Sequence, residues 1–213
     1  ISIWGNDLTL HAPATRRMTD LTRQTLRRAN GLMADCTRDV RLAQGWGFDA
    51  QKPALVVVGN GGIDLEETDS ILAGSSKAEP LQVINPRGMR SYVRNDVFFK
   101  AAALVHQTHP EVQFVCASMA GQPEAEYWVQ TLNLAGSVRL LPYLDQADLW
   151  LEFARSAVSV SVSTHDGTPN TLLEAMAFGC LPVCGDLESI REWITPGVNG
   201  LLTDSTNPQS LAE

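Results

Sequence analysis

The feature that most constrains the fold is an alternation of short apolar runs with longer segments of helical period, which begins at Leu81. Repeats of this kind are typical of parallel strands that are joined by right-handed helical crossovers. We expect strands over 81–84, 112–116, 138–141, 157–162, 181–184 and 200–202, and helices over 96–108, 124–134, 146–156, 169–178 and 187–194. The sequence therefore predicts an α/β fold with a Rossmann-like, doubly wound parallel sheet. Such sheets bind ligands beyond the carboxyl ends of their strands.

The residues before this alternation form a region with its own strand and helix signals. Ile1–Trp4 and Ala54–Val58 are β-prone runs, and the spacing of apolar residues predicts an amphipathic helix over Met18–Met33. Later the chain becomes acidic and then small and polar, which is typical of a linker. We therefore predict three parts: a first domain segment over 1–64, a linker over 65–80 and a larger domain over 81–213.

The net charge of −8 and the sequence pI of about 5.0 argue against a nucleic-acid-binding protein, because such proteins present basic surfaces to phosphates. One segment, residues 15–41, nevertheless carries seven arginines. We interpret this segment as the solvated face of a helix, and a contact with anionic lipid head groups is the alternative. No apolar stretch approaches the roughly 18 to 20 residues that a membrane-spanning helix needs.

The four cysteines and four histidines show no spacing that is typical of a metal site. Three of the cysteines lie in apolar runs, where a free thiol packs as a small hydrophobic group. We therefore predict no metal and a reducing, cytoplasmic compartment, with a peripheral position at the membrane left open. The chain opens at Ile1 without an initiator methionine or a leader, which predicts a piece of a longer polypeptide.

The most informative stretch for function runs from Val160 to Gly179. A buried strand ends near Ser163, Thr168 is placed to cap a helix, and Pro169 falls at the first helical position, where a missing N–H costs nothing. Gly179 then closes the helix. The unsatisfied amides at the start of this helix, beside the positive end of its dipole, predict a phosphate site. These amides belong to Asn170, Thr171 and Leu172.

Two acidic residues flank this predicted phosphate site. Asp166 lies in the turn before the helix, and Glu174 lies in the second turn of the helix. A carboxylate can accept hydrogen bonds from vicinal hydroxyls such as those of a ribose. The pair therefore suits a ligand with hydroxyls at both ends and a diphosphate between them, which describes a nucleotide-sugar. In the alternative interpretation, Asp166 only supports the turn and Glu174 is an ordinary acid on a helix surface.

This stretch, together with Cys180–Asp186 and Pro196–Leu202, resembles the group 1, family 4-like retaining glycosyltransferases of GT-B architecture. The hallmark of that family is a pair of glutamates with seven residues between them. Here the pair is Asp166 and Glu174, so the first acid is shorter by one methylene. The glycine-rich run Val57–Asp64 is similar to the signature that precedes the C-terminal domain in the family.

The resemblance implies a role for each of these residues. Asp166 would bind the donor sugar, Glu174 would bind the nucleotide ribose, and loop amides would bind the diphosphate, namely those of Gly167, Thr168, Asn170, Thr171 and Leu172. The family also places two cations on the donor phosphates, after the first strand of the domain. Arg87 matches the first cation, an arginine, whereas the second is a lysine in the family and Arg94 stands in for it here, with Arg90 as its rival. Arginine suits this place because it can grip a phosphate with two N–H groups.

The resemblance also implies an activity and a division of the chain. It implies a retaining hexosyltransferase of polysaccharide biosynthesis that moves a sugar from a nucleotide-diphosphate-sugar to a glycan or lipid-linked acceptor, without metal or cofactor. Residues 1–64 would end the acceptor-side N-terminal domain, and 81–213 would be the donor-binding domain without its last helix. This piece alone could bind donor without transferring it. A non-catalytic nucleotide-sugar-binding protein and a sugar-nucleotide epimerase of the same architecture are the alternatives.

Overall fold

The structure is a computed structural model that describes residues 1–58, 62–78 and 81–213. The chain divides into two compact units: the first contains residues 1–62, 165–170 and 187–193, and the second contains residues 63–164, 171–186 and 194–213. Residues 59–61 of the glycine-rich run, and residues 79–80 at the end of the expected linker, lie outside the described residues. The domain limits at residues 64 and 80 stay predictions.

The first unit holds a parallel sheet of three strands in the order β1-β2-β3. The strands are β1 (Ser2–Ile3), β2 (Leu32–Ala34) and β3 (Ala54–Val56). The outer two agree with expected strands, but β2 was not expected. The spacing predicts a helix through Met33, whereas Met33 lies in β2 and pairs with Leu55. A run of only three strand residues is too short to show the alternation by which strands are recognised.

Two α-helices and two short helical turns complete the first unit: the π-helical turn η1 (Asp7–His11), α1 (Arg16–Arg28), α2 (Thr37–Trp46) and the 3-10 turn η2 (Ile190–Glu192). Helix α1 begins after Thr15, whose Oγ1 accepts a hydrogen bond from the N–H of Met18 at 3.1 Å. The helices pack on the sheet through a small core that contains Ile3, Leu8, Leu26, Leu32, Ala43 and Phe48.

The second unit contains a six-stranded parallel sheet, as the alternation predicts. Its strands are β4 (Gln82–Asn85), β5 (Gln113–Cys116), β6 (Val138–Leu140), β7 (Val158–Ser161), β8 (Leu181–Gly185) and β9 (Leu201–Thr203). Their order is β6-β5-β4-β7-β8-β9, so the chain moves outward from β4 in one direction and then from β7 in the other. The switch point of this doubly wound sheet therefore lies between β4 and β7.

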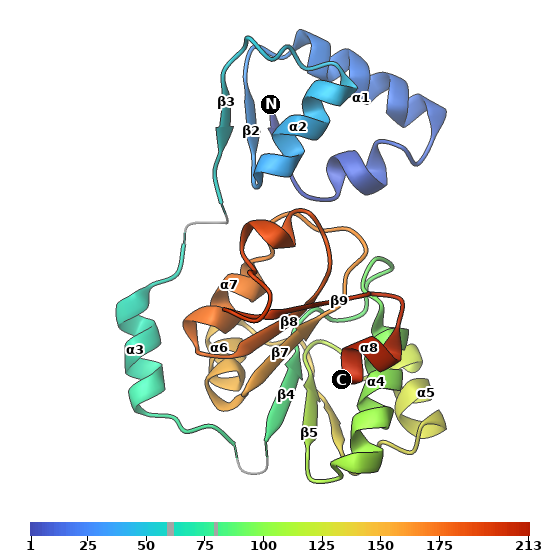
Figure 1. The fold of residues 1–213 in the computed structure, drawn as a ribbon, viewed down its shortest axis with the longest axis vertical. Helices are drawn as coiled ribbons and strands as arrows, with labels where there is room; N and C mark the ends of the chain where they lie inside the picture. The colour runs from blue at the N-terminus through green and yellow to red at the C-terminus, as the bar shows by residue number, and fades with distance from the viewer. Residues whose placement is uncertain (59–61, 79–80) are drawn as a thin grey trace. The chain divides into compact units, whose positions relative to one another are not determined.

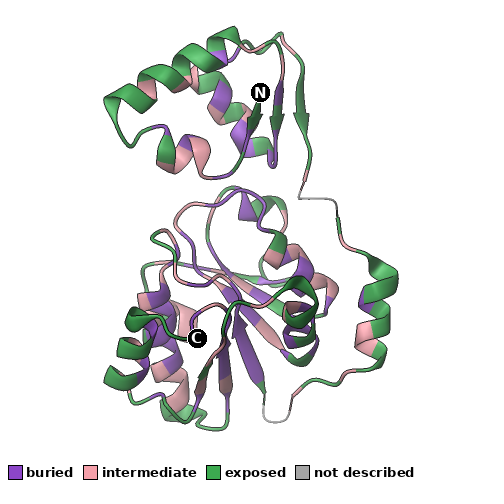
Figure 2. Ribbon diagram, turned by 180° about the vertical axis from the view of Figure 1, so that it is seen from behind, coloured by how far each residue is buried: buried purple, intermediate pink, exposed green. Residues whose placement is uncertain are grey.

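Helices cover both faces of this sheet (Figure 1). They are α4 (Asn95–Thr108), α5 (Pro123–Thr131), α6 (Gln146–Arg155), α7 (Asn170–Ala177) and α8 (Pro208–Ala212), while α3 (Leu65–Ala73) contacts α6. One core joins the sheet to α4 and α5, and a second core joins it to α6 and α7. The strands between them are mostly buried (Figure 2). The segment expected as a linker contains α3, whose Ile71 and Leu72 pack against the second core. The Rossmann-like α/β prediction is confirmed.

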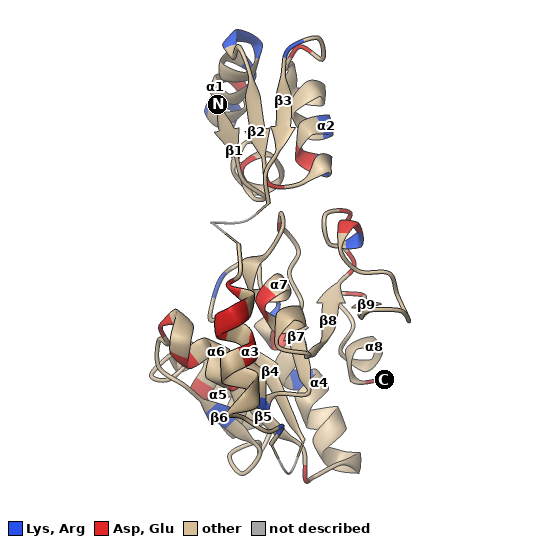
Figure 3. Ribbon diagram, turned by 90° about the vertical axis from the view of Figure 1, so that its left-hand side faces the viewer, with Lys and Arg blue, Asp and Glu red and all other residues tan. Residues whose placement is uncertain are grey.

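Charge is concentrated on particular helices (Figure 3). Helix α1 contains five arginines and one aspartate, and four of its arginines lie within its first two and last two positions. Helix α3 has the opposite character, with Glu66, Glu67 and Asp69 and no basic residue. None of the helices among the described residues is both long and apolar enough to cross a bilayer.

Candidate functional site

A cavity of about 410 Å³ opens at the carboxyl ends of β4, β5 and β6, wholly within the second unit. Three loops and two helices line it, through Pro86–Arg90, Ser118, Gln122, Tyr143–Gln146, Leu149 and Glu174. The cavity is therefore at the edge where an open α/β sheet binds its ligand, beside the switch point between β4 and β7. Its volume is in the range of small-molecule sites.

Two buried asparagines hold the loop that carries Arg87. Asn85 Nδ2 donates a hydrogen bond to Asn95 Oδ1 at 3.1 Å, and Asn95 Nδ2 donates to the carbonyl of Gly88 at 3.0 Å. Gly88 has a φ of +66°, a left-handed conformation that favours glycine, and an added Cβ would lie 3.2 Å from Ser118 Cβ. The network and the glycine together fix the backbone on both sides of Arg87.

Arg87 reaches the first turn of α7, where its Nη1 donates a hydrogen bond to Thr171 Oγ1 at 3.4 Å. Helix α7 begins at Asn170, one residue later than predicted, which is within the usual scatter of helix limits. Gly179, with a φ of +69°, follows the end of the helix as expected. The structure thus brings the predicted phosphate cation to the predicted phosphate-binding helix start.

Glu174 lines the same cavity as Arg87. The residue is only 9% exposed, so it does not lie on an open helix surface. Its Oε1 accepts a hydrogen bond from Gln146 Nε2, the first residue of α6, at 3.2 Å. Leu172, two residues earlier on α7, turns its side chain into the protein and is 3% exposed. One wall of the cavity therefore presents a guanidinium and another presents a carboxylate.

Arg94, the expected second cation, is paired with an acid in the structure. Its Nε and Nη2 donate to the two carboxylate oxygens of Asp96, at 2.8 and 3.0 Å. This pairing raises the pKa of Arg94 and lowers the pKa of Asp96. The rival cation, Arg90, lines the cavity, and its Nη1 donates to the hydroxyl of Tyr92 at 2.9 Å.

The remaining predicted site residues, Asp166, Gly167, Thr168 and Asn170, belong to the first unit. Asp166 is buried, and its Oδ1 accepts a hydrogen bond from the N–H of Gly167 at 3.1 Å. The carbonyl of Asp166 accepts a further hydrogen bond from Ser189 Oγ at 2.8 Å. Trp193 Nε1 donates to Thr168 Oγ1 at 3.1 Å. Segments 165–170 and 187–193 therefore hold each other through polar contacts.

Sequence reasoning missed three residues that shape the cavity: Asn85, Asn95 and Gln146. Asn85 carried a usable signal, because a polar residue at the carboxyl end of a buried strand lies at the ligand edge of the sheet. Asn95 and Gln146 are ordinary polar residues at the first positions of α4 and α6. Their partners are Gly88, seven residues before Asn95, and Glu174, 28 residues after Gln146, and neither spacing is a recognised local pattern.

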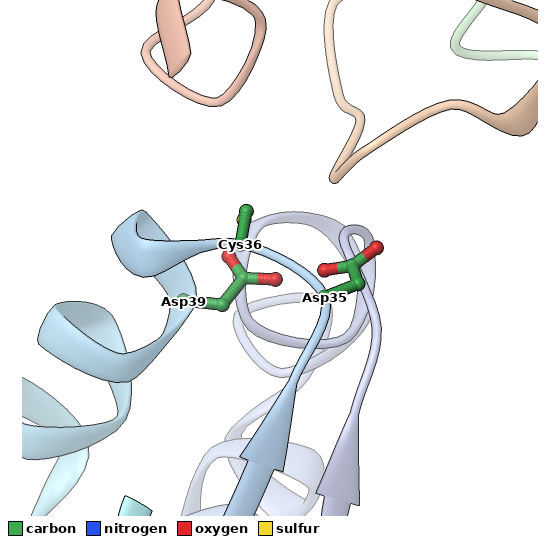
Figure 4. A group of neighbouring side chains, drawn as sticks. All are labelled: Asp35, Cys36 and Asp39. Carbon is green, nitrogen blue, oxygen red and sulfur yellow. The ribbon is translucent and has the colours of Figure 1, made fainter. Parts of the chain in front are cut away.

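Among the described residues, one group has the spacing of metal ligands: Asp35, Cys36 and Asp39, whose ligand atoms lie within 4.8 Å of one another (Figure 4). All three are buried. Arg38 already supplies a positive charge there, because its Nη2 lies 2.6 Å from Asp39 Oδ1. Burial also raises the pKa of the Cys36 thiol far above its ordinary value, which keeps the thiol protonated.

The two aspartates of this group are better described as a buried carboxyl pair. Asp35 Oδ1 and Asp39 Oδ2 have no hydrogen-bond partner among the described residues. Burial raises the pKa of Asp39 to about 6, although the hydrogen bonds from Arg38 oppose this. A proton on one carboxyl group can bridge to the other, which satisfies both oxygens. The prediction that the protein needs no metal stays a prediction.

The model of the family described as glycosyl transferases group 1 matches residues 66–213 of the chain, which is more than half of it. No curated protein matches the chain in a sequence search. Solved structures of similar fold are known. The Anabaena protein Alr3699/HepE, in complex with UDP-glucose, superposes with a TM-score of 0.78 at 18% identity, over 98% of this chain and 59% of that one.

Two further solved structures superpose on different shares of this chain. The pneumococcal O-GlcNAc transferase GtfA, in complex with UDP and GlcNAc, superposes with a TM-score of 0.76 at 14% identity, over 99% of this chain and 44% of that one. The C-terminal domain of the group 1 glycosyl transferase LpcC from Francisella tularensis superposes with a TM-score of 0.58 at 18% identity, over 71% of this chain and 84% of that domain.

The chain thus spans less than two thirds of the length of the HepE and GtfA proteins. At these identities the superpositions show the fold, which is the Rossmann-like α/β architecture of the GT-B enzymes, and the match of the family model adds the sequence relationship. Since that match and the sheet order agree over the same residues, this chain belongs to the group 1 glycosyl transferases.

Proposed function

We propose that this chain is the donor-binding part of a retaining hexosyltransferase, which moves a sugar from a nucleotide-diphosphate-sugar to a glycan or lipid-linked acceptor in cytoplasmic polysaccharide biosynthesis. Family membership supports transfer of a sugar. The UDP-glucose in the HepE complex, and the UDP and GlcNAc in the GtfA complex, support a UDP-sugar as the donor. Because the chain spans only part of those proteins, the acceptor and the transfer step are proposed for the longer protein.

One observation carries the proposal: Arg87 and Glu174 line a single cavity at the switch point of the sheet. In a nucleoside diphosphate the ribose is bonded directly to the diphosphate. A guanidinium and a carboxylate on neighbouring walls of one cavity therefore suit adjacent parts of one ligand, with Arg87 on the phosphates and Glu174 on the ribose hydroxyls. The hydrogen bond from Arg87 to Thr171 places the cation beside the first turn of α7, where an anion is also favoured.

The proposed chemistry concerns the departing diphosphate. As the bond between the sugar and the diphosphate breaks, negative charge grows on the phosphate oxygens, and preorganised cations and N–H groups stabilise it. We assign this role to Arg87 and Arg94 and to the backbone amides of Thr171 and Leu172 in the first turn of α7. The amides of Gly167, Thr168 and Asn170, which belong to the first unit, stay an expectation from the family. Asp166 is assigned to the donor sugar. With two arginines and these amides, the reaction proposed here uses no metal and no cofactor.

Calorimetry on the full chain tests the donor assignment. We expect UDP to bind, and the same titration with GDP and ADP identifies the base. Arg87→Ala is expected to weaken UDP binding by about 1.5 to 3 kcal/mol, the range for a hydrogen bond to a charged group, and to leave uridine binding unchanged. Equal losses for UDP and uridine would reject the phosphate role of Arg87. If none of UDP, GDP and ADP binds, the proposed function is rejected.

An activity assay on the longer protein distinguishes sugar transfer from the two alternative functions. With UDP-glucose and a glycan or lipid-linked acceptor, a transferase forms a glycosylated product. A sugar-nucleotide epimerase would instead interconvert sugar epimers without any acceptor. A non-catalytic binding protein would do neither and would still bind the nucleotide-sugar.

We also propose that the basic 15–41 segment contacts anionic lipids at the membrane surface through α1, which carries five of its seven arginines. At 100° per residue, Arg16, Arg23 and Arg27 project from one side of α1, with Arg17 and Arg28 on the neighbouring strip. All five are exposed, in a chain whose net charge is −8. Met18 and Leu21 are 41% and 45% exposed on the same helix. Basic residues beside exposed apolar ones suit an interface with anionic head groups.

Sedimentation with lipid vesicles tests this contact. We expect binding to vesicles that contain phosphatidylglycerol, loss of that binding as salt is raised, and no binding to pure phosphatidylcholine vesicles. The variant Arg17→Gln/Arg28→Gln should bind less. Its matched control is Lys100→Gln/Arg155→Gln, which removes two exposed positive charges from α4 and α6. Equal behaviour of the two double variants would reject a role for α1.

A further inference from the structure

The hydrogen bond between Gln146 and Glu174 joins two helices across the wall of the cavity. Gln146 Nε2 donates to Glu174 Oε1 at 3.2 Å, and both side chains line the cavity. The orientation of the amide follows from its partner, because a carboxylate only accepts hydrogen bonds and so must meet the N–H side of the glutamine. Among the described residues, this is the one hydrogen bond that the Glu174 carboxylate receives from a side chain.

The packing between α6 and α7 fixes the positions of both residues. Trp150 and Phe153 of α6 contact Phe178, just after α7, with ring centroids 5.4 and 6.5 Å apart. All three rings are at least 97% buried. At the start of α6, Asp145 Oδ1 accepts a hydrogen bond from the N–H of Asp148 at 2.9 Å, which holds the first turn in place. The glutamine is therefore presented to Glu174 by a rigid support.

We propose that Gln146 is a positioning residue, which orients the Glu174 carboxylate to receive the ribose hydroxyls of the donor nucleotide. This inference rests on the proposed function, since it assumes that Glu174 binds the ribose. A glutamate side chain has three rotatable bonds, and holding it in one orientation before the ligand arrives lowers the entropy cost of binding. The amide engages Oε1 and leaves Oε2 for a ligand hydroxyl.

The test compares UDP with 2′,3′-dideoxy-UDP, which keeps the base and the diphosphate but lacks both ribose hydroxyls. We expect Gln146→Leu to weaken UDP binding by about 2- to 10-fold, the cost of ordering one long side chain during binding, and to leave dideoxy-UDP binding unchanged. Gln146→Glu should weaken UDP binding further at neutral pH, because two carboxylates then repel each other, and should recover as the pH falls. Gln130→Leu, an exposed glutamine of α5, is the matched control.

A double-mutant cycle separates positioning from direct contact with the ligand. If Gln146 acts through Glu174, then Gln146→Leu has no further effect on UDP binding in the Glu174→Ala background. Additive losses, or an equal loss for dideoxy-UDP, would overturn the inference. If Glu174→Ala weakens UDP binding while Gln146→Leu does not, only the positioning role fails. If Glu174→Ala leaves UDP binding unchanged, the ribose assignment in the proposed function fails instead.

Discussion

Glu174 and the pair of Asp35 and Asp39 place their carboxyl groups in two contrasting environments. In the second unit, Glu174 lines a cavity and accepts one hydrogen bond from the neutral amide of Gln146. In the first unit, Asp35 and Asp39 face each other inside a buried cluster beside Arg38 (Figure 4). Both places gather acidic oxygens, yet only the cavity leaves them accessible to a ligand.

The difference shows that surroundings, more than the number of acids, decide what a carboxylate can do. A carboxylate at a cavity wall keeps oxygens that ligand hydroxyls can reach. A buried pair must share a proton or a neighbouring cation, since leaving two charges unpaired away from water is costly. Glu174 is therefore a candidate binding residue, whereas Asp35 and Asp39 are buried residues of the first unit.

The largest effect is expected when the buried pair loses its cation. Arg38 is 7% exposed, and its Nε and Nη2 both donate to Asp39 Oδ1. Arg38→Met should lower the free energy of unfolding by about 3 to 5 kcal/mol, because it leaves a buried carboxylate without its partner. Urea denaturation measures this. The control Arg41→Met changes a residue that is 60% exposed, and it should lower the free energy of unfolding by less than about 1 kcal/mol. Equal losses of stability in the two variants would contradict the prediction that burial makes Arg38 the more important cation.

The pH dependence of stability should carry the signature of Asp39. Its pKa is about 6 in the folded chain against an ordinary value of 3.8, so the folded state retains a proton that the unfolded state releases. Between about pH 4 and 6 this group therefore makes stability fall as the pH rises, by up to about 1.4 kcal/mol per pH unit. Thermal midpoints across that window measure the slope.

Asp39→Asn should flatten this dependence, because the amide does not titrate. The carboxyl groups of Asp96 and Asp204 have lowered pKa values, so their contributions have the opposite sign and appear at lower pH. An unchanged slope in Asp39→Asn would show that the buried pair does not hold the extra proton.

At the cavity, the expected effect is on binding. Glu174→Ala should weaken UDP binding by about 1.5 to 3 kcal/mol, since it removes a charged acceptor of the ribose hydroxyls. Calorimetry measures this, and urea denaturation should show a smaller change in stability than Arg38→Met produces. If Glu174→Ala leaves the affinity for UDP unchanged, Glu174 does not bind the ribose.

The smallest effect is expected at another acid, Asp96, which is half-buried and paired with Arg94. Asp96→Asn should lower the free energy of unfolding by less than about 1 kcal/mol, because solvent screens a pair of this exposure. Urea denaturation again provides the measurement. A loss of stability as large as that of Arg38→Met would mean that burial does not determine how much each acid and its arginine contribute to the free energy of unfolding.

Local sequence signals were sufficient for the larger sheet. Short β-prone runs that alternate with helical segments made all six strands of the second unit visible in the sequence, including the partly exposed edge strands β6 and β9. The start and end of α7 were visible for a similar reason, since Pro169 and Gly179 restrict the backbone locally. The short strand β2 was missed because three residues, Leu32–Ala34, give too little pattern.

The site was only partly visible. Arg87 and Glu174 were found through motifs, and the structure brings both to one cavity. The hydrogen bond from Gln146 to Glu174 and the asparagines that hold the Arg87 loop were not found, because each depends on where the loops converge. The pairing of Arg94 with Asp96 depends on side-chain orientation, which spacing alone does not give.

The sequence by itself determined the parallel α/β architecture, the family and two of the residues that face the cavity, since periodicity, turn residues and motifs act over short distances along the chain. Only the tertiary structure decided which polar groups meet: Gln146 with Glu174 at the cavity, and Asp35 with Asp39 in a buried pair. The physical reason is that burial and hydrogen bonding depend on neighbours in space, and packing of the helices on the sheet chooses those neighbours.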